Sequence, residues 1–143
     1  MDLVISCTRV KCKKNEFFVH IGKLCVQKVR KMCKKLDELL ENLPVTLQKF
    51  YCPYNQITKI ENLPASLQTF GCWNNEITKI ENLSASLREF GCQGNRITKI
   101  ENLPASLQTF NCGRNRITKI ENLPVSLQNF YCWNNEITKI ENL

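Results

Sequence analysis

The chain contains few of the residue types on which enzymatic chemistry usually depends. Its 143 residues include a single histidine, His20, and only five glycines. One histidine leaves little material for acid–base or triad catalysis, and no glycine-rich phosphate loop, HExxH pair or nucleophile elbow occurs. We therefore expect a non-enzymatic protein that uses no cofactor and acts on no small-molecule substrate.

Long apolar runs are also missing from the sequence. No stretch of 18 consecutive apolar residues occurs, so a membrane-spanning helix is not expected. The N-terminal Met-Asp-Leu-Val-Ile-Ser-Cys-Thr-Arg has neither the basic start nor the apolar stretch of a secretory signal peptide. With 43% hydrophobic residues the chain can bury a core, and we expect one domain in the cytoplasm.

What the sequence does contain is a 20-residue repeat in five copies, which begin at Leu43, Leu63, Leu83, Leu103 and Leu123. Eleven of the 20 positions are identical in all copies, four vary conservatively, and five vary freely in size and charge. A fixed period of this length is typical of a solenoid, in which each coil buries its apolar edge only against its neighbours.

The copies align as Leu-x-x-Phe-x-Cys-x-x-Asn-x-Ile, as in Leu67, Phe70, Cys72, Asn75 and Ile77. This pattern resembles the leucine-rich repeat signature, with Phe and Cys at the second and third Leu positions. It covers residues 43–143, and the short period with Leu-Pro-x-Ser-Leu is similar to repeats of bacterial effectors and of large DNA viruses of amoebae. The resemblance implies an α/β solenoid shaped as a horseshoe, with a parallel concave sheet and an irregular or polyproline II convex side. It also implies a protein-binding role, in the host cytoplasm if the chain is a viral protein or an effector.

The invariant positions themselves predict how each coil is built. Phe70 and Cys72 alternate with variable positions, so residues 69–72 should form a short strand with these two side chains inward. Six apolar columns then form the core, represented by Leu67, Phe70, Cys72, Ile77, Ile80 and Leu83. The invariant asparagine, Asn75 in this copy, should bond backbone groups of adjacent coils as a ladder.

Cysteine and charge also follow the period. Five of the nine cysteines occur once per coil, at Cys52, Cys72, Cys92, Cys112 and Cys132. Since no CxxC pair or converging histidines accompany them, we expect buried free thiols and no metal site, which favours a reducing compartment. Invariant Lys and Glu, such as Lys79 and Glu81, should form two solvated columns on the convex face, with a docking role as the alternative.

Residues 1–42 form a different unit. A loose alternation over Asp2 to Lys13 predicts a strand or small hairpin. Apolar residues at spacings of three and four predict an amphipathic helix over about 16–41, with Asn15 as its N-cap. We expect this helix to cap the first coil. As an alternative, the basic side of the helix could contact nucleic acid or an anionic membrane through Lys28, Arg30, Lys31, Lys34 and Lys35.

The functional prediction rests on the five freely varying positions of each copy. In the repeat pattern they line the concave sheet and its rim, and they include large aromatic and arginine side chains, the types that dominate interface hot spots. Gly91, Gly94 and Gly113 should lower the floor between these side chains. The predicted partner-binding residues are Tyr51, Tyr54, Trp73, Glu89, Arg96, Arg114, Arg116, Tyr131 and Trp133. The expected partner is a protein, with the aromatics as anchors and the arginines as donors to acidic or backbone groups.

The last copy suggests a second interface. No polar cap follows Glu141-Asn142-Leu143, so the apolar side chains of the fifth coil should be covered on one side only. An unpaired strand edge of this kind favours pairing with another chain. We expect either a homodimer through Leu127, Phe130, Ile137 and Ile140, or a longer repeat array of which this chain is a fragment.

Overall fold

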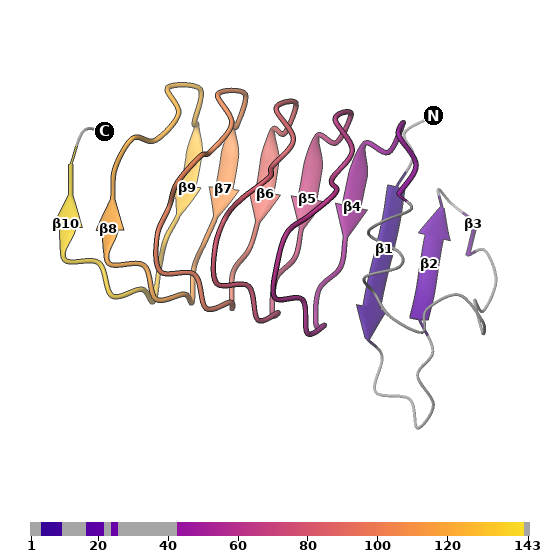
Figure 1. The fold of residues 1–143 in the computed structure, drawn as a ribbon, viewed down its shortest axis with the longest axis horizontal. Coiled ribbons are helices and arrows are strands. Elements are labelled where there is room, and N and C mark those ends of the chain that lie inside the picture. The colour runs from indigo at the N-terminus through magenta and orange to yellow at the C-terminus, as the bar shows by residue number, and fades with distance from the viewer. Residues whose placement is uncertain (1–3, 10–16, 22–23, 26–42, 142–143) are drawn as a thin grey trace.

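The structure is a computed structural model that describes residues 4–9, 17–21, 24–25 and 43–141. It is a stack of short coils, each of which contributes one strand to a common sheet (Figure 1). The strands are β1 (Val4–Arg9), β2 (Phe17–Ile21), β3 (Leu24–Cys25), β4 (Lys49–Tyr51), β5 (Thr69–Gly71), β6 (Glu89–Gly91), β7 (Thr109–Asn111), β8 (Lys119–Ile120), β9 (Asn129–Tyr131) and β10 (Lys139–Ile140).

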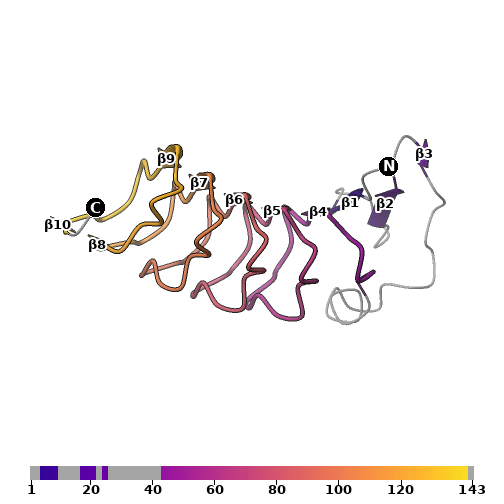
Figure 2. The same ribbon diagram turned by 90° about the horizontal axis from the view of Figure 1, so that it is seen from above.

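The main sheet has eight strands in the order β3-β2-β1-β4-β5-β6-β7-β9. From β4 to β9 neighbouring strands are parallel and in register, so that Phe70 pairs with Phe50 on one side and with Phe90 on the other. These strands lie along the inner side of a shallow curve, with the return segments on the outer side (Figure 2). The expected parallel β-solenoid of five turns, with its sheet on the concave side, is therefore confirmed.

The core consists of the invariant apolar columns. In the three central coils the columns represented by Leu67, Phe70, Cys72, Ile77 and Ile80 are at most 5% exposed. The sixth predicted column, represented by Leu83, is half-buried and packs against this core. The phenylalanine rings stack face to face along the solenoid, with centroids 5.5 to 5.7 Å apart between successive coils. Because each coil presents the same ring at the same height, a single coil would leave both faces of its phenylalanine in water.

The invariant asparagines form the expected ladder. The Asn95 side chain accepts a bond from the backbone N–H of Ile77 at 2.9 Å. Its Nδ2 donates to the carbonyl oxygens of Cys72 and Cys92, at 3.0 and 2.9 Å. Asn75, Asn115 and Asn135 repeat this arrangement. Each asparagine thus satisfies backbone groups where the chain leaves the strand and could not otherwise pair them.

Two columns of the repeat have left-handed backbone at every described position. One is the invariant asparagine of Glu-Asn-Leu, with φ of 51 to 55° at Asn62, Asn82, Asn102 and Asn122. The other is the residue before the ladder asparagine, with φ of 50 to 70° at Tyr54, Asn74, Gly94, Arg114 and Asn134. Asparagine and glycine tolerate this conformation, whereas tyrosine and arginine adopt it only at a cost.

The cysteine column lies inside the coils, as predicted. Cys52, Cys72, Cys92 and Cys112 are buried free thiols, and Cys132 in the last coil is a half-buried free thiol. Burial, and secondarily the neighbouring thiol, raises the pKa of Cys72 and Cys92 well above its usual value. The same causes raise the pKa of Cys112 to about 12. These thiols remain protonated and serve as small apolar core groups.

The N-terminal unit differs from the expected one. The segment predicted to begin a helix near Glu16 instead contains β2 and β3, so that part of the prediction is wrong. This segment is rich in aromatic and β-branched residues, namely Phe17, Phe18, Val19 and Ile21, which favour strands. Backbone pairing with β1 stabilises the strand over a helix here. The remainder of the predicted helix and its basic cluster lie outside the described residues.

The strand β1 lies within the segment for which a strand or hairpin was expected. It pairs in parallel with β4, joining Val4 to Lys49 and Ile5 to Phe50 in register, and antiparallel with β2. The backbone edge of the first coil is therefore covered by a strand of the N-terminal unit. No helix occurs in the parts of the chain that the structure describes, so they supply no α component of the predicted α/β class.

The fifth coil is more exposed than the coils before it. Leu107, Phe110 and Ile117 of the fourth coil are fully buried, whereas their counterparts Leu127, Phe130 and Ile137 are half-buried. Ile140 is 59% exposed. On the convex side β10 pairs in parallel with β8, which ties the last two coils together there.

Candidate functional site

The candidate site is the set of outward side chains on the concave sheet and its adjoining rim, which we call the variable face. Parallel pairing in register arranges these residues in rows that cross the coils. One row is Lys49, Thr69, Glu89, Thr109 and Asn129. The next row is Tyr51, Gly71, Gly91, Asn111 and Tyr131. Because the scaffold beneath is nearly identical in every coil, differences along a row change the surface alone.

An aromatic pair occupies the N-terminal part of the variable face. The rings of Tyr51 and Trp73 meet edge to face, with centroids 6.0 Å apart and an interplanar angle of 63°. Gly71 lies between them, and a Cβ at this position would be 2.7 Å from Cδ1 of Tyr51 and would overlap the Trp73 indole. The glycine therefore lets the indole lie down against the sheet, in contact with the preceding coil.

A shallow hollow of about 180 Å³ adjoins this aromatic pair. Its lining comes from four successive coils: Tyr51, Thr69, Phe70, Gly71, Trp73, Glu89, Phe90, Gly91, Gln93, Thr109 and Asn111. Of these described lining residues, Glu89 alone is charged at neutral pH. Oε1 of Gln93 is shielded from solvent and accepts no hydrogen bond from a described residue. The hollow thus combines an aromatic wall with two oxygen acceptors.

The pKa of the Tyr51 hydroxyl reflects the burial and the charges around it. Partial burial raises the pKa of Tyr51, and the Glu89 carboxylate raises it further, while Lys49 opposes them. Glu89 itself makes no ion pair with a described residue. Its negative charge is therefore available to a ligand in the hollow.

A second aromatic cluster occupies the C-terminal part of the variable face. The Arg114 guanidinium lies over the Trp133 indole, 5.2 Å from the ring centroid. Gly113 of the preceding coil makes room for the indole, since a Cβ there would be 2.5 Å from Cε2 of Trp133. Trp133 is 47% exposed, so one part of the indole is covered by its own chain and the rest faces solvent.

The other predicted site residues are distributed around these two clusters. Arg96 forms an ion pair with Glu76 at 3.1 Å and is therefore already partnered. Arg116 is exposed and makes no ion pair with a described residue. Tyr54 and Tyr131 are 57% and 49% exposed, and neither stacks on another ring of the described chain. The structure thus groups Tyr51, Trp73 and Glu89 apart from Arg114 and Trp133.

The expected glycine floor is only partly present. Gly91 does line the hollow. Gly113 instead lies under the Trp133 indole, and Gly94, with φ of 70°, lies against the Asn74 side chain. The reason is that a flat aromatic ring fills the space above a glycine more readily than solvent does.

Gly71 and Gln93 occupy freely varying positions but were not among the predicted partner-binding residues. Gly71 shares its row with Tyr51 and Tyr131, and a glycine beside an aromatic column was a signal that a ring could cover it. Gln93 shares its column with Trp73 and Trp133. Nothing in the sequence indicates that its amide oxygen would be shielded without a donor.

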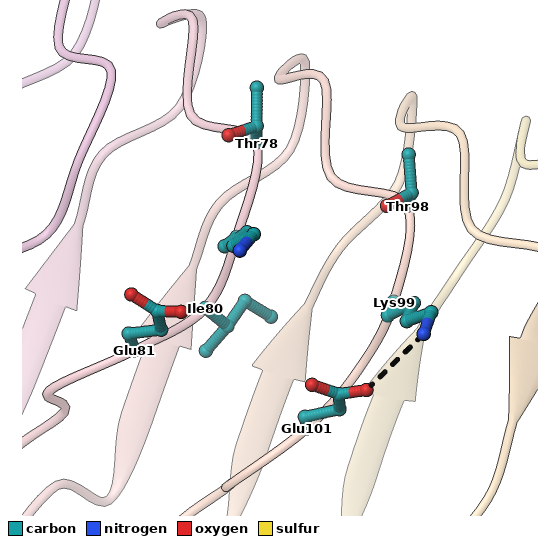
Figure 3. Close-up of a pocket in the computed structure, with 7 residues that line it drawn as sticks. Thr78, Ile80, Glu81, Thr98, Lys99 and Glu101 are labelled. Atoms are coloured by element: carbon teal, nitrogen blue, oxygen red, sulfur yellow. Dashed lines mark ion pairs between the residues drawn. The ribbon is translucent and has the colours of Figure 1, made fainter.

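The convex face also has a hollow, of about 200 Å³, between the second and third coils (Figure 3). Thr78, Ile80 and Glu81 border it on one coil, and Thr98, Lys99 and Glu101 on the next, with Lys99 and Glu101 paired at 3.8 Å. All of these are invariant positions of the repeat, so the same surface is offered by every coil. Such a surface provides no basis for selecting one place on the solenoid.

Two further findings concern the described residues. They contain no helix that is long and apolar enough to cross a membrane. No cluster of three or more His, Cys, Asp or Glu side chains converges among them in a way that could hold a metal ion.

Comparison with solved structures finds the same architecture elsewhere. The leucine-rich repeat domain of a Shigella effector superimposes with a TM-score of 0.65 at 30% identity, over 68% of this chain and 44% of that structure. YopM from Yersinia enterocolitica WA-314 superimposes with a TM-score of 0.57 at 20% identity, over 71% of this chain and 27% of that one. The chain thus spans less than half the length of either structure. Neither protein-family profiles nor curated proteins give a match.

These findings define the class of protein. The chain is a leucine-rich repeat domain, built from 20-residue repeats in a solenoid that resembles those of bacterial effectors. Leucine-rich repeat domains are generally non-catalytic and are typical protein-binding modules.

Proposed function

We propose that this domain is a non-enzymatic module that binds a protein partner in the cytoplasm through its variable face. Trp73 and Trp133 act as anchors, and Arg114 and Arg116 donate charge-assisted hydrogen bonds to acidic or backbone groups of the partner. The observation that carries the proposal is the placement of both tryptophans, each laid against a glycine, on a face whose scaffold is otherwise the same in every coil.

The composition of the face supports a protein rather than a small ligand. Tyr54, Tyr131 and Trp133 are each about half exposed, and large aromatics are costly to leave in water without a use. The hollow beside Trp73 is shallow and holds only about 180 Å³, less than a pocket for a drug-sized molecule. A broad surface with a few anchors is typical of protein recognition.

The proposal is tested by comparing capture of host proteins by three forms of the domain. The wild type, the Trp73→Ala/Trp133→Ala variant and the convex control Lys79→Ala/Lys99→Ala are immobilised at equal density after circular dichroism shows equal folding. We expect the tryptophan variant to lose proteins that the wild type and the convex control both retain. If all three forms capture the same proteins, the variable face is not the binding surface.

A second contact is favoured by the exposed apolar side chains of the fifth coil. Leu127, Phe130 and Ile137 are half-buried and Ile140 is exposed, so another coil stacked on them would bury four apolar side chains. A second copy of this chain offers such a coil with the same shape. Light scattering should then show a dimer at tens of micromolar that the Phe130→Ser/Ile140→Lys variant abolishes. A monomer under these conditions contradicts self-association.

A further inference from the structure

The two tryptophans of the variable face have the same backbone position but different partners. At Trp133 the residue 19 positions earlier is Arg114, whose guanidinium covers the indole at 5.2 Å from the centroid. At Trp73 the residue 19 positions earlier is Tyr54, which makes no ring contact with Trp73. The chain therefore supplies a guanidinium to one indole and none to the other.

The surroundings of Trp73 are suited to a cation. Among the described residues that line the hollow, Glu89 alone is charged at neutral pH, and it has no ion-pair partner in the described parts of the chain. None of these lining residues is a lysine or an arginine. A cation that entered would meet a carboxylate and an indole in one place, and both attract positive charge.

The hollow also offers an acceptor that lacks a donor. Oε1 of Gln93 is shielded from water and has no hydrogen-bond partner, a condition that costs free energy until a donor arrives. Gly91 lies beside this atom, where a Cβ would be 3.2 Å from it, so the glycine leaves room for the Gln93 amide to turn toward a ligand. A ligand group with several N–H donors in one plane could bond Gln93 and Glu89 together while lying on the ring.

On these grounds we infer that the hollow beside Trp73 binds an arginine side chain of the partner protein, with the guanidinium between the indole, the Glu89 carboxylate and Oε1 of Gln93. This inference rests on the proposed protein-binding function, and it names the partner group that the N-terminal half of the variable face recognises. Arginine fits better than lysine because its planar fork stacks on aromatic rings and donates to two acceptors at once, whereas an ammonium is a strongly hydrated point charge.

With this assignment the two halves of the variable face prefer partner groups of opposite charge. The Trp73 half accepts a cation, while Arg114 and Arg116 in the other half attract acidic groups. A partner segment that carries an arginine followed, several residues later, by acidic residues would satisfy both halves in one orientation only. Charge pattern would then determine the direction in which the segment lies across the coils.

The test uses the full chain and a probe that needs no identified partner. Nα-acetylarginine amide is titrated into the protein while the indole N–H resonances of Trp73 and Trp133 are followed by NMR. Nα-acetylcitrulline amide serves as the uncharged probe of nearly the same shape, and Nα-acetyllysine amide as the cation without a planar fork. Glu89→Gln is the site variant, and Glu81→Gln is the control variant, with an exposed glutamate on the convex face.

We expect a saturable shift of the Trp73 resonance with the arginine probe and little change at Trp133. Glu89→Gln and the replacement of arginine by citrulline should each weaken binding at least about fivefold, and Glu81→Gln should leave it unchanged. Equal binding of citrulline, equal binding of lysine, or an unchanged affinity of Glu89→Gln would each overturn the arginine assignment.

The outcome is separable from that of the proposed function. If Glu89→Gln captures partner proteins as the wild type does while Trp73→Ala/Trp133→Ala does not, the variable face binds proteins and the arginine assignment is wrong. If the tryptophan variant captures the same proteins as the wild type, protein binding by this face is wrong, even where the arginine probe still binds at Trp73.

Discussion

The guanidinium of Arg114 lies over the indole of Trp133 in the next coil, although Arg114 itself has a left-handed backbone with φ of 52°. The same column holds Asn74, Gly94 and Asn134 in three other coils, and these residues adopt this conformation with little strain. Arginine at this place therefore costs backbone free energy and gains a contact on the variable face. This combination is what a residue retained for binding would show.

Tyr54 allows the cost of the left-handed column to be measured without loss of a ring contact. Its φ is 57° and its side chain is 57% exposed. We expect Tyr54→Asn to raise the free energy of unfolding by about 0.5–1 kcal/mol, since asparagine tolerates this conformation better. Urea denaturation provides the measurement. Arg114→Asn should give a change near zero, because relief of strain is offset by loss of the cation–π contact; destabilisation by Tyr54→Asn would contradict the argument.

Gly71→Ala should disturb the aromatic pair while leaving the fold in place. The added Cβ would overlap the Trp73 indole and would come within 2.7 Å of Tyr51, and both contacts are with ends of surface side chains that can move. We expect a red shift of the Trp73 fluorescence, measured with Trp133→Phe to isolate it, and weaker partner capture. Gly91→Ala is the matched control, because its Cβ would lie 3.2 Å from Oε1 of Gln93 and 4.0 Å from Cε3 of Trp73, an ordinary van der Waals contact with the indole. Equal spectra for the two variants would show that Gly71 does not position Trp73.

Asn95→Ala should destabilise the solenoid at its centre. The backbone N–H of Ile77 would lose its acceptor in a buried site, while the carbonyls of Cys72 and Cys92 would keep the bonds from neighbouring ladder residues. A loss of about 2–4 kcal/mol is expected from the orphaned donor and the missing bonds. Asn129→Ala, an exposed asparagine with one 3.5 Å side-chain bond, should change stability by less than about 0.5 kcal/mol. Denaturant unfolding of both variants distinguishes the ladder from a general effect of removing an asparagine.

The buried thiols predict a loss of stability in alkali. Burial raises the pKa of Cys112 from 9.0 to about 12, so above pH 9 the unfolded chain loses a proton that the folded chain keeps. The stability from thiol burial is therefore complete below pH 9 and is lost between about pH 9 and 12, at up to ~1.4 kcal/mol per pH unit for each such thiol. Unfolding curves measured across this range should show a shallower decline for Cys112→Ala than for the wild type. Parallel declines would mean that Cys112 is not the titrating group, since lysine and tyrosine contributions are the same in both proteins.

Much of the scaffold was predictable because the repeat sorts its own positions. Phe70 and Cys72 are invariant while Thr69 and Gly71 vary, which was enough to place the strand and its inward face. The asparagine ladder followed from the same logic, since an invariant polar residue beside buried positions must bond backbone groups. The helix expected from about residue 16 was wrong for β2 and β3, because apolar spacing of three and four in Phe18 and Ile21 does not separate a helix from a strand that has pairing partners.

The candidate site was predictable as a face but not as an arrangement. The variable positions identified Trp73 and Trp133, yet only the structure shows that each indole lies against a glycine and that one of them is covered by Arg114. The unpartnered oxygen of Gln93 and the hollow beside Glu89 were likewise invisible in the sequence. Side-chain direction on an exposed rim depends on neighbours from other coils, which a one-dimensional pattern does not contain.

The sequence by itself determined the period, the number of coils and which positions are buried. The reason is that invariant apolar residues of identical stacked units can be buried only between the coils. Only the tertiary structure decided which variable side chains meet, since those contacts join residues 19 to 22 positions apart whose orientation depends on rotamer choice and on space left by Gly71 and Gly113. Hydrophobic burial is a property of each position, whereas a binding surface is a property of the distances between positions.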